Sequence, residues 1–515
     1  MSTTLIPSTS SLEPNVQAQK DWILRTVMLA SAVISVLAYV YYAQDGHTLD
    51  YPDAIAHQVI ARRVIDSPTS GIVQWGNVWL PLPHFLSLPL IWVDAFYFTG
   101  FAGSVVSMLS YIVATTYLYK TVQQLTGSRA GAVAAAAVFA LNPNILYMQS
   151  TPMTELLLFA TVIVTVYLVQ RWIQTERYTY LMGAGIVATL ACLTRYEAWV
   201  ITFALVVVVG LVSIRRYNFT KASSLTLLFG LASAVGIALW IVWNLVFFGN
   251  PLGFQNGEYS KPSIWVSVSD PAIGHWLVAA KTYWFATLSN IGWVAVTVAL
   301  VGIVVTFFKK EWWPQLIPTF ALLGLAPFFV YALYAGQRPL HVVEINGDMY
   351  NVRFGLFMAL PVSIFIGCLV SQLWKVQTVA AGLIVLGAAA QAMTTPQPTL
   401  LKEPIAWLTG DNARMLRGAS MYMGSHYSSG RILSRFFLNE NVLFDAIIPP
   451  TDNVYEGSYL IWGKALKDPI SENIEWIIMR VDESDPLYTD LANSPAIDSY
   501  QLMYDRDGYR IYHRK

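Results

Sequence analysis

The chain has 515 residues, of which 55% are hydrophobic and only 12% are charged, and its formal net charge is zero. Soluble domains carry about 25% charged residues, so this composition excludes an ordinary soluble protein and indicates a polytopic membrane protein. The balanced charge gives no indication of a nucleic-acid partner. The only two cysteines, Cys192 and Cys368, lie inside apolar runs and are expected to be packing residues.

The N-terminal 20 residues are polar and rich in Ser, Thr and Pro, and they are expected to be disordered. The apolar run 22–43 follows them. It is too long for a signal-peptide core and lacks a small-residue cleavage pattern. We therefore expect residues 1–22 to form a cytoplasmic N-terminus and the run to be a retained signal-anchor helix.

Apolar windows of about 18 or more residues predict about eleven transmembrane helices within a transmembrane domain that spans 23–393. The windows are 23–43, 97–119, 130–148, 152–170, 178–194, 196–214, 222–248, 289–308, 315–335, 353–373 and 376–393.

The positive-inside bias predicts the orientation of these helices. A cytoplasmic N-terminus places the basic residues between helices, such as Lys120, Arg129 and Arg215, on the cytoplasmic side. An odd helix count then places the segment 394–515 outside.

The segment 394–515 has a different composition, because 16 of the 31 acids lie in 401–515. Short apolar runs at 475–479 and 509–512, broken by turn residues, predict strands. We therefore expect 394–515 to be a small extracytoplasmic α/β domain.

The remaining acids are unevenly placed, since eleven of these 15 fall at or beyond the outer face in this topology. A chemical site, if present, therefore faces outward. That position argues against a nucleoside triphosphate as donor or energy source, because that pool is cytoplasmic.

The first outer loop contains the charged stretch LDYPDAIAHQVIARRVIDS, residues 49–67. Pro52 suits the first turn of a helix, and the apolar spacing after it is helical. Asp53 and His57, four residues apart, share one face. We expect a short helix along the outer membrane surface, with its apolar side in the headgroup boundary and its polar side toward a cavity.

An alternative interpretation remains for this stretch. Asp50, Asp53, His57, Arg62 and Arg63 could form a solvated face that only anchors a loop. The segment 74–84 contains Pro and Gly and predicts a second interfacial element, so interfacial helices are expected near 52–95.

Glu155 follows an outer loop that ends in Thr151-Pro152. Pro152 is predicted to begin the next helix with Thr151 as its cap. Glu155 would then lie in the first turn, where an acid is favoured by about 0.3–1 kcal/mol. Helix capping alone could explain this acid.

Two arginines lie at the ends of apolar runs. Arg195 and Glu197 interrupt the run 180–214, where a charge costs about 2.5–3.5 kcal/mol and tends to be functional. Arg353 enters the window 353–373. An outward arginine suits a phosphate ligand, although Arg195 could merely pair with Glu197 and Arg353 could reach lipid headgroups.

These loops place acids, imidazoles and arginines on the same face of one bundle. A carboxylate can take a proton from an acceptor hydroxyl, and arginines can hold a phosphate leaving group. The pattern predicts a transferase site at the outer membrane surface, fed by a lipid-linked donor. The side chains expected to line its substrate pocket are His57, Tyr196, Glu197 and Tyr350.

The sequence resembles the GT-C glycosyltransferases, and most of all the branch with the protein O-mannosyltransferases and the lipid A aminoarabinose transferases. The matching motifs, in order, are Asp53 with His57 and Ala61-Arg62, then Pro152-Met-Thr-Glu155, Leu193-Thr-Arg195, and Arg353-Phe354 through Leu360-Pro361. The resemblance covers 20–370. The chain departs from the branch at Ala54, where Glu is usual. It lacks the Trp-Trp-Asp motif of the oligosaccharyltransferases.

The resemblance implies roles for these residues. Asp53 would be the catalytic base, with Asp50 as its rival, and Glu155 would be a second acid. The residues implied at the donor phosphate are Arg195, Arg353 and Arg62. A divalent metal ion, with His84 as a ligand, is a further possibility, and no other cofactor is expected.

We therefore expect an inverting sugar transfer from a polyprenyl-phosphate donor to a hydroxyl on a lipid, glycan or protein, at the outer face of the cell membrane. The chain would be embedded in membrane lipids. Two rival interpretations are a transporter or flippase of a lipid-linked substrate, and a non-catalytic scaffold that displays the segment 394–515. Transporters place their charges near the bilayer midplane rather than at helix ends.

Overall fold

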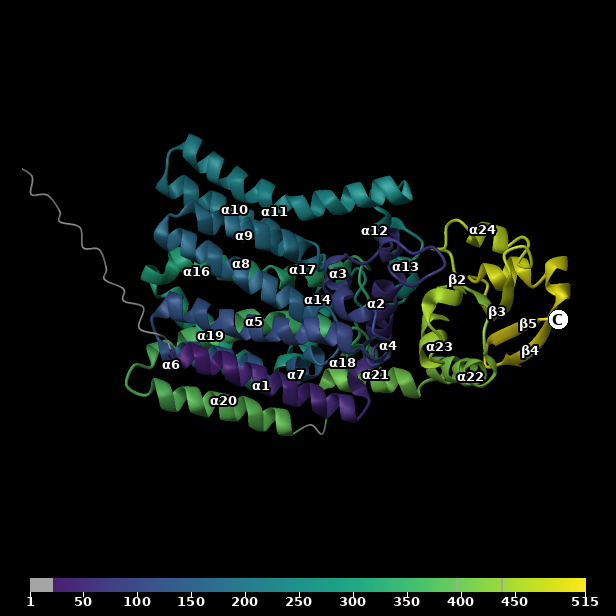
Figure 1. Cartoon of the computed structure of the whole chain (residues 1–515). Coiled ribbons are helices and arrows are strands. Elements are labelled where there is room, and N and C mark those ends of the chain that lie inside the picture. Colours follow the sequence, from purple (N-terminus) through teal and green to yellow (C-terminus); the bar gives the residue numbers. More distant parts are fainter. Residues whose placement is uncertain (1–21, 395–396, 437–438) are drawn as a thin grey trace, which may run out of the picture.

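The computed structural model describes residues 22–394, 397–436 and 439–515. It shows a long helical bundle with a small sheet-containing domain at one end (Figure 1). The disorder expected for residues 1–20 lies outside the described residues.

Among the described residues, seven segments are long and apolar enough to cross a membrane. They are α1 (Trp22–Gln44), α5 (Phe101–Thr126), α8 (Glu155–Thr175), α10 (Glu197–Arg216), α11 (Phe219–Phe248), the segment Lys310–Tyr334 with α16 (Trp313–Leu323) and α17 (Leu325–Tyr334), and the segment Val352–Gln372 with η4 (Val352–Met358) and α19 (Ala359–Gln372).

Two further helix pairs among the described residues are apolar enough to cross a membrane when taken together, but each pair is sharply bent. α6 (Arg129–Ala140) and α7 (Pro143–Gln149) are bent by 64°, and α14 (Trp276–Ile291) and α15 (Trp293–Phe307) by 109°. The shorter apolar helices are α3 (Leu82–Ile91), α9 (Tyr178–Cys192) and α20 (Gln377–Met393). The prediction of a multi-pass membrane protein is thus confirmed. The predicted count of eleven transmembrane helices is not confirmed: within the described part, length and composition support seven spans, or nine if each bent pair is one span.

Each break has a local cause. Asn142 caps α7, because its side-chain oxygen accepts hydrogen bonds from the backbone N–H groups of Asn144 and Ile145 at 2.8 and 3.2 Å. Gly292, between α14 and α15, has φ 89°, a conformation that favours glycine.

Between α1 and α5, the chain forms a layer of short helices at the end of the bundle nearest the sheet domain (Figure 1). They are η1 (His47–Leu49), α2 (Pro52–Arg63), η2 (Ile72–Trp75), α3 and α4 (Asp94–Phe98). Three further short helices of the loops are α12 (Gly253–Asn256), α13 (Pro262–Trp265) and α18 (Val343–Asn346).

The prediction that α2 lies on the membrane surface is wrong. All residues from Ala54 to Arg63 are buried. The sheet domain covers the helix: the Arg63 guanidinium lies over the rings of Phe436 and Tyr455, 4.2 and 4.3 Å from their centroids. The side chains of Arg62 and Arg63 therefore face protein rather than lipid headgroups.

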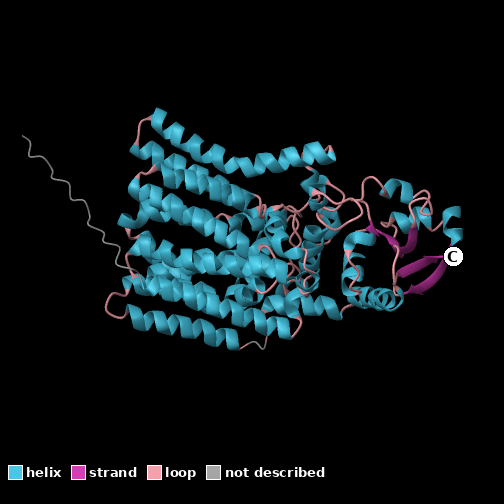
Figure 2. Cartoon of the chain, viewed as in Figure 1, coloured by secondary structure: helices cyan, strands magenta, loops and turns pink. Residues whose placement is uncertain are grey.

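The strands lie in the C-terminal domain (Figure 2). Its elements are α21 (Thr399–Thr409), α22 (Asp411–His426), β1 (Arg431–Ser434), α23 (Asn439–Asp445), η5 (Pro450–Asp452), β2 (Asn453–Val454), α24 (Trp462–Ala465), β3 (Ile474–Arg480), η6 (Leu487–Leu491), η7 (Pro495–Ser499), β4 (Tyr500–Arg506) and β5 (Tyr509–Arg514). The sheet order is β2-β1-β3-β5-β4, with β1 parallel to β2 and β3, and β5 antiparallel to β3 and β4. The two strands predicted from sequence are present as β3 and β5.

Candidate active site

The site is an alternating row of acids and arginines at the end of the bundle that meets the C-terminal domain. Arg353 Nη2 lies 2.5 Å from Asp53 Oδ2, and Arg353 Nε lies 3.4 Å from Glu155 Oε1. The same Glu155 oxygen lies 3.0 Å from Arg195 Nη1. Arg195 then forms a two-pronged contact with Glu197, 3.1 Å at each oxygen. Buried charges require such pairing.

Four helices, including α10 with Glu197 at its first position, and one turn supply this row. Pro52 opens α2 and places Asp53 in its first turn. Glu155 is the first residue of α8, after the N-cap Thr154. The predicted start at Pro152, with Thr151 as cap, is therefore wrong, although Glu155 does lie in the first turn. Arg195 occupies the turn between α9 and α10, and Arg353 lies in η4.

The acids of the row differ in exposure. The side chain of Asp53 is 38% exposed, whereas those of Glu155 and Glu197 are 0% and 4% exposed. Only Asp53 among these three carboxylates can reach a substrate that enters from outside. Glu155 has one oxygen, Oε2, that is buried without a hydrogen-bond partner.

Glu403 of α21 supports the row from the C-terminal side, and sequence analysis missed it. Its carboxylate accepts hydrogen bonds from the backbone N–H groups of Asn351 and Val352, at 2.7 and 3.0 Å. It also accepts one from the Tyr51 hydroxyl at 3.3 Å. Burial raises the pKa of Glu403, although the Arg353 charge opposes this. The only sequence signal was an acid within the apolar helix that follows the last window.

The two tyrosines near Arg353 complete this end of the row. The Arg353 guanidinium lies over the Tyr51 ring, 5.1 Å from its centroid. Tyr350 is half-buried, and burial and the Asp53 charge raise its pKa to about 12. Tyr350 is therefore close enough to Asp53 to feel its charge, and its place in the substrate pocket stays a prediction.

Arg338 is a further cation at this site that sequence analysis missed. It lies in the loop after α17, is half-buried, and acts electrostatically on Tyr196 and Glu197. It forms no ion pair with any acid of the described residues. Arg195 and Arg353 each pair with two carboxylates. Of the three arginines, Arg338 is therefore the one whose charge is least neutralised.

Other predicted residues lie elsewhere. Asp50 is buried and paired with His47, 2.7 Å from its Nδ1, and burial raises the pKa of Asp50. Arg62 is bound at 2.8 Å to both Asp66 and Asp94. The structure therefore does not bring Asp50 or Arg62 into the row.

Tyr196 is a structural tether rather than an open pocket residue. Its hydroxyl donates to the Val78 carbonyl at 2.5 Å and accepts from Trp240 Nε1 at 3.0 Å. Its ring stacks on Phe254. It thereby fixes the loop before α3 to the bundle.

His57 and His84 form a buried pair, with His57 Nδ1 2.8 Å from His84 Nε2. Burial and the charges of Arg195 and Arg353 lower the pKa of His57 to about 3, and burial also lowers that of His84. Both rings are therefore neutral at pH 7. In the described ranges, no group of three or more His, Cys, Asp or Glu could hold a metal ion. These residues do not fit the metal site that the resemblance implied.

Comparisons with known proteins agree with this architecture. Residues 91–243 match the family model of the dolichyl-phosphate-mannose-protein mannosyltransferases. The fold is similar to the crystal structure of ArnT from Cupriavidus metallidurans bound to undecaprenyl phosphate, with a TM-score of 0.52 and 12% identity over 93% of this chain and 97% of that one. The apo structure of the same ArnT has the same TM-score and 13% identity, over the same shares of both chains.

The chain is less similar to the apo structure of the oligosaccharyltransferase of Archaeoglobus fulgidus. The TM-score is 0.49, with 12% identity over 97% of this chain and 75% of that one. No curated protein sequence matches significantly. The ArnT likeness shows that the chain has the fold of that structure. The mannosyltransferase family model matches residues 91–243, so that likeness concerns this part of the chain.

Proposed function

We propose that the protein transfers a sugar from a polyprenyl-phosphate donor to an acceptor hydroxyl, at the outer face of the cell membrane and with inversion. The observation that carries this proposal is the exposed Asp53 carboxylate beside the arginine row. Support for the donor comes from the ArnT fold, since that structure contains undecaprenyl phosphate.

Asp53 would act as the general base. It takes the proton of the acceptor hydroxyl while that oxygen attacks the anomeric carbon, and the bond from this carbon to the phosphate oxygen breaks with its electrons on the phosphate. General-base help of this kind contributes about 10²–10⁴ in rate. Asp50 is the weaker candidate, because it is buried against His47.

The arginines would stabilise the charge that develops on the leaving phosphate. In the structure, Arg353 is paired with Asp53. A phosphate at this site competes for the same guanidinium and so releases Asp53 to accept a proton. Arg338 and Arg195 would hold the remaining phosphate oxygens, since Arg338 forms no ion pair with an acid among the described residues.

Glu155 would position both arginines rather than touch the substrate. It is fully buried and contacts both of them through one oxygen. We assign this machinery to a transmembrane domain of 23–393, with the segment 394–515 beside the acceptor. The N-terminus would be cytoplasmic and the C-terminus outside, as the positive-inside bias predicts.

The test compares Asp53→Asn with Asp50→Asn in a deletion strain, at matched protein levels. Mass spectrometry follows the envelope glycans and the polyprenyl-phosphate sugars. We expect wild type and Asp50→Asn to restore a missing sugar, and Asp53→Asn to leave the lipid-linked donor accumulated. Full restoration by Asp53→Asn would overturn the assignment. If wild type moves a labelled lipid-linked sugar across proteoliposomes without transfer, the protein is a flippase instead.

A further inference from the structure

A groove lies far from the acid–arginine row, at the end of the bundle opposite the C-terminal domain, where α6 begins (Figure 1). Its volume is about 1020 Å³, at the upper end of the range for ligand pockets. Its walls come from α1, the α5–α6 turn, α6 and the first half of α20.

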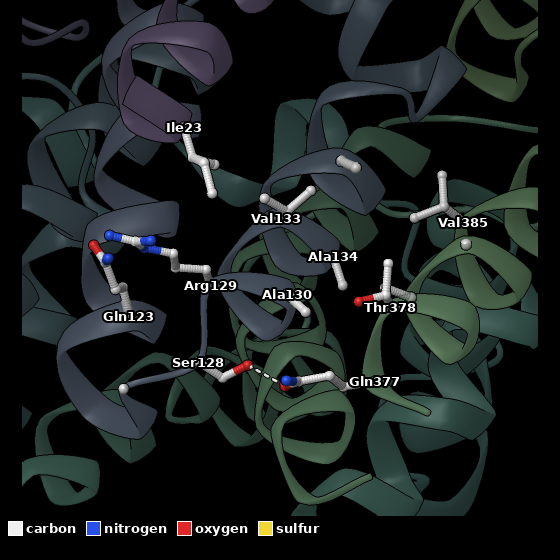
Figure 3. A pocket seen from close by; sticks show the side chains of 14 residues that line it. Ile23, Gln123, Ser128, Arg129, Ala130, Val133, Ala134, Gln377, Thr378 and Val385 are labelled. Atoms are coloured by element: carbon white, nitrogen blue, oxygen red, sulfur yellow. Dashed lines mark hydrogen bonds between the residues drawn. The ribbon is translucent and has the colours of Figure 1, made fainter. Parts of the chain in front are cut away.

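One side of the groove is polar. Gln123 and Arg129 lie side by side at one end, with Ser128 and Gln377 along one edge (Figure 3). The Ser128 hydroxyl donates to Gln377 Oε1 at 2.8 Å, which joins the α5–α6 turn to α20. Ser128 also caps α6, since its side chain accepts from the Gly131 N–H at 3.0 Å.

The charge at this edge is positive. Arg129 is exposed and forms no ion pair with an acid in the described part of the chain. It also stands at the first residue of α6, where the helix dipole is positive and disfavours a cation. α20 begins at the same edge. An anion here would be attracted by Arg129 and by both helix N-termini.

The floor of the groove is apolar and made of small residues. Ala130, Val133 and Ala134 lie between the polar edge and Val385 on the far side (Figure 3). A Cβ built on Gly382, in the groove wall, meets no atom within 4 Å. The space can therefore take flexible hydrocarbon but offers few polar groups to bind a fully polar ligand.

The helices beside the groove are loosely held. Of α20, Ala381 is the only residue buried, and 11% of the apolar window of α1 is buried inside the chain. A ligand in the groove would add apolar contact to α1 and α20, which have few buried residues.

We propose that this groove binds one anionic phospholipid of the surrounding bilayer, with its phosphate at Arg129 and an acyl chain along α6 and α20. The amphiphilic lining and the membrane-embedded position select a lipid over a soluble anion. In the orientation proposed above, this end faces the cytoplasmic leaflet, where anionic lipids attract basic residues. The site is separate from the transferase site and does not depend on that function.

The experiment is native mass spectrometry of the full-length protein, released from nanodiscs that contain phosphatidylglycerol or phosphatidylcholine. We expect wild type to retain one phosphatidylglycerol at least about fivefold more than phosphatidylcholine. Arg129→Gln should lower this preference by removing the charge. Gly382→Phe should lower retention of the lipid by filling the groove.

Matched controls separate the groove from general effects. Arg215→Gln removes an exposed arginine outside the groove, and Val379→Phe adds a ring on the lipid-exposed face of α20. Both should retain phosphatidylglycerol like wild type. If Gly382→Phe does not fold, the pair Arg129→Gln and Arg215→Gln carries the test.

Three results would overturn the proposal. Equal retention of the two lipids shows that no anion site exists. Wild-type retention in a folded Gly382→Phe or in Arg129→Gln places the lipid elsewhere. Displacement of the lipid by millimolar inorganic phosphate shows that the site binds phosphate rather than an amphiphile.

Discussion

Arg353 donates a hydrogen bond of 2.5 Å to Asp53, although 300 positions separate the two residues in the sequence. The contact joins the first turn of α2 to the beginning of the segment Val352–Gln372. It explains why a chain that is 12% charged keeps charges in both places. Each charge neutralises another, and the exposed member of the pair is Asp53.

Replacing Arg353 should reveal how strongly the row is coupled. Arg353→Gln leaves Asp53 and Glu155 without this partner, and removing one partner of a buried pair costs about 3–5 kcal/mol. Arg353→Lys should be intermediate, because one ammonium cannot reproduce the planar fork that reaches both acids. Thermal unfolding in detergent should give melting temperatures that fall in the order wild type, Arg353→Lys, Arg353→Gln.

A double-mutant cycle provides the control for this prediction. Arg353→Gln combined with Glu155→Gln should cost clearly less than the sum of the single changes, since the double variant removes both charges of one contact. Strict additivity would contradict a coupled row. It would show that the two side chains stabilise the fold independently.

Glu403→Gln should disturb the site without touching the substrate. The amide keeps one acceptor oxygen but turns N–H groups toward the backbone donors of Asn351 and Val352, so a loss of about 1–3 kcal/mol is expected. Because the same backbone carries Arg353, sugar transfer should fall as well. Sugar transfer and the melting temperature are measured for this variant and for the control variant Lys402→Gln, at the neighbouring position. The control should change neither quantity. Normal transfer in a destabilised Glu403→Gln would mean that Glu403 serves the fold alone.

His57 predicts a pH dependence of stability. Its pKa is lowered by burial from 6.5 to about 3 in the folded protein, so below pH 6.5 the unfolded chain binds the extra proton. The neutral His57 ring therefore makes its full contribution to the stability of the folded protein above pH 6.5. Between pH 6.5 and pH 3, each unit of acidification lowers the free energy of unfolding by up to about 1.4 kcal/mol.

The measurement compares wild type with His57→Gln from pH 7.5 to pH 5. The variant lacks this titration, so the wild type should lose melting temperature relative to it as the pH falls. The surface change His426→Gln serves as control and should leave the pH profile as in wild type. Parallel profiles for wild type and His57→Gln would mean that the imidazole is not held neutral.

Composition and apolar runs were enough to predict the membrane bundle and the C-terminal strands, because hydrophobic windows and alternating strands depend on local physics. The order of motifs also pointed to Asp53, Glu155, Arg195 and Arg353, which the fold brings into one row. Their specific roles stay predictions that the variants above test.

Only the tertiary structure decided which helices are buried and which charges pair, because these contacts join segments that are distant in the sequence. The i,i+4 spacing of Arg62 and Asp66 is a local signal of their pairing, whereas the Arg62–Asp94 contact and the place of Arg353 in the row come from distant segments. α2 has the pattern of a surface helix, yet the C-terminal domain buries it. Glu403 enters the site only because α21 folds back against Asn351, since the partners of a carboxylate are set by three-dimensional packing and not by its neighbours in the chain.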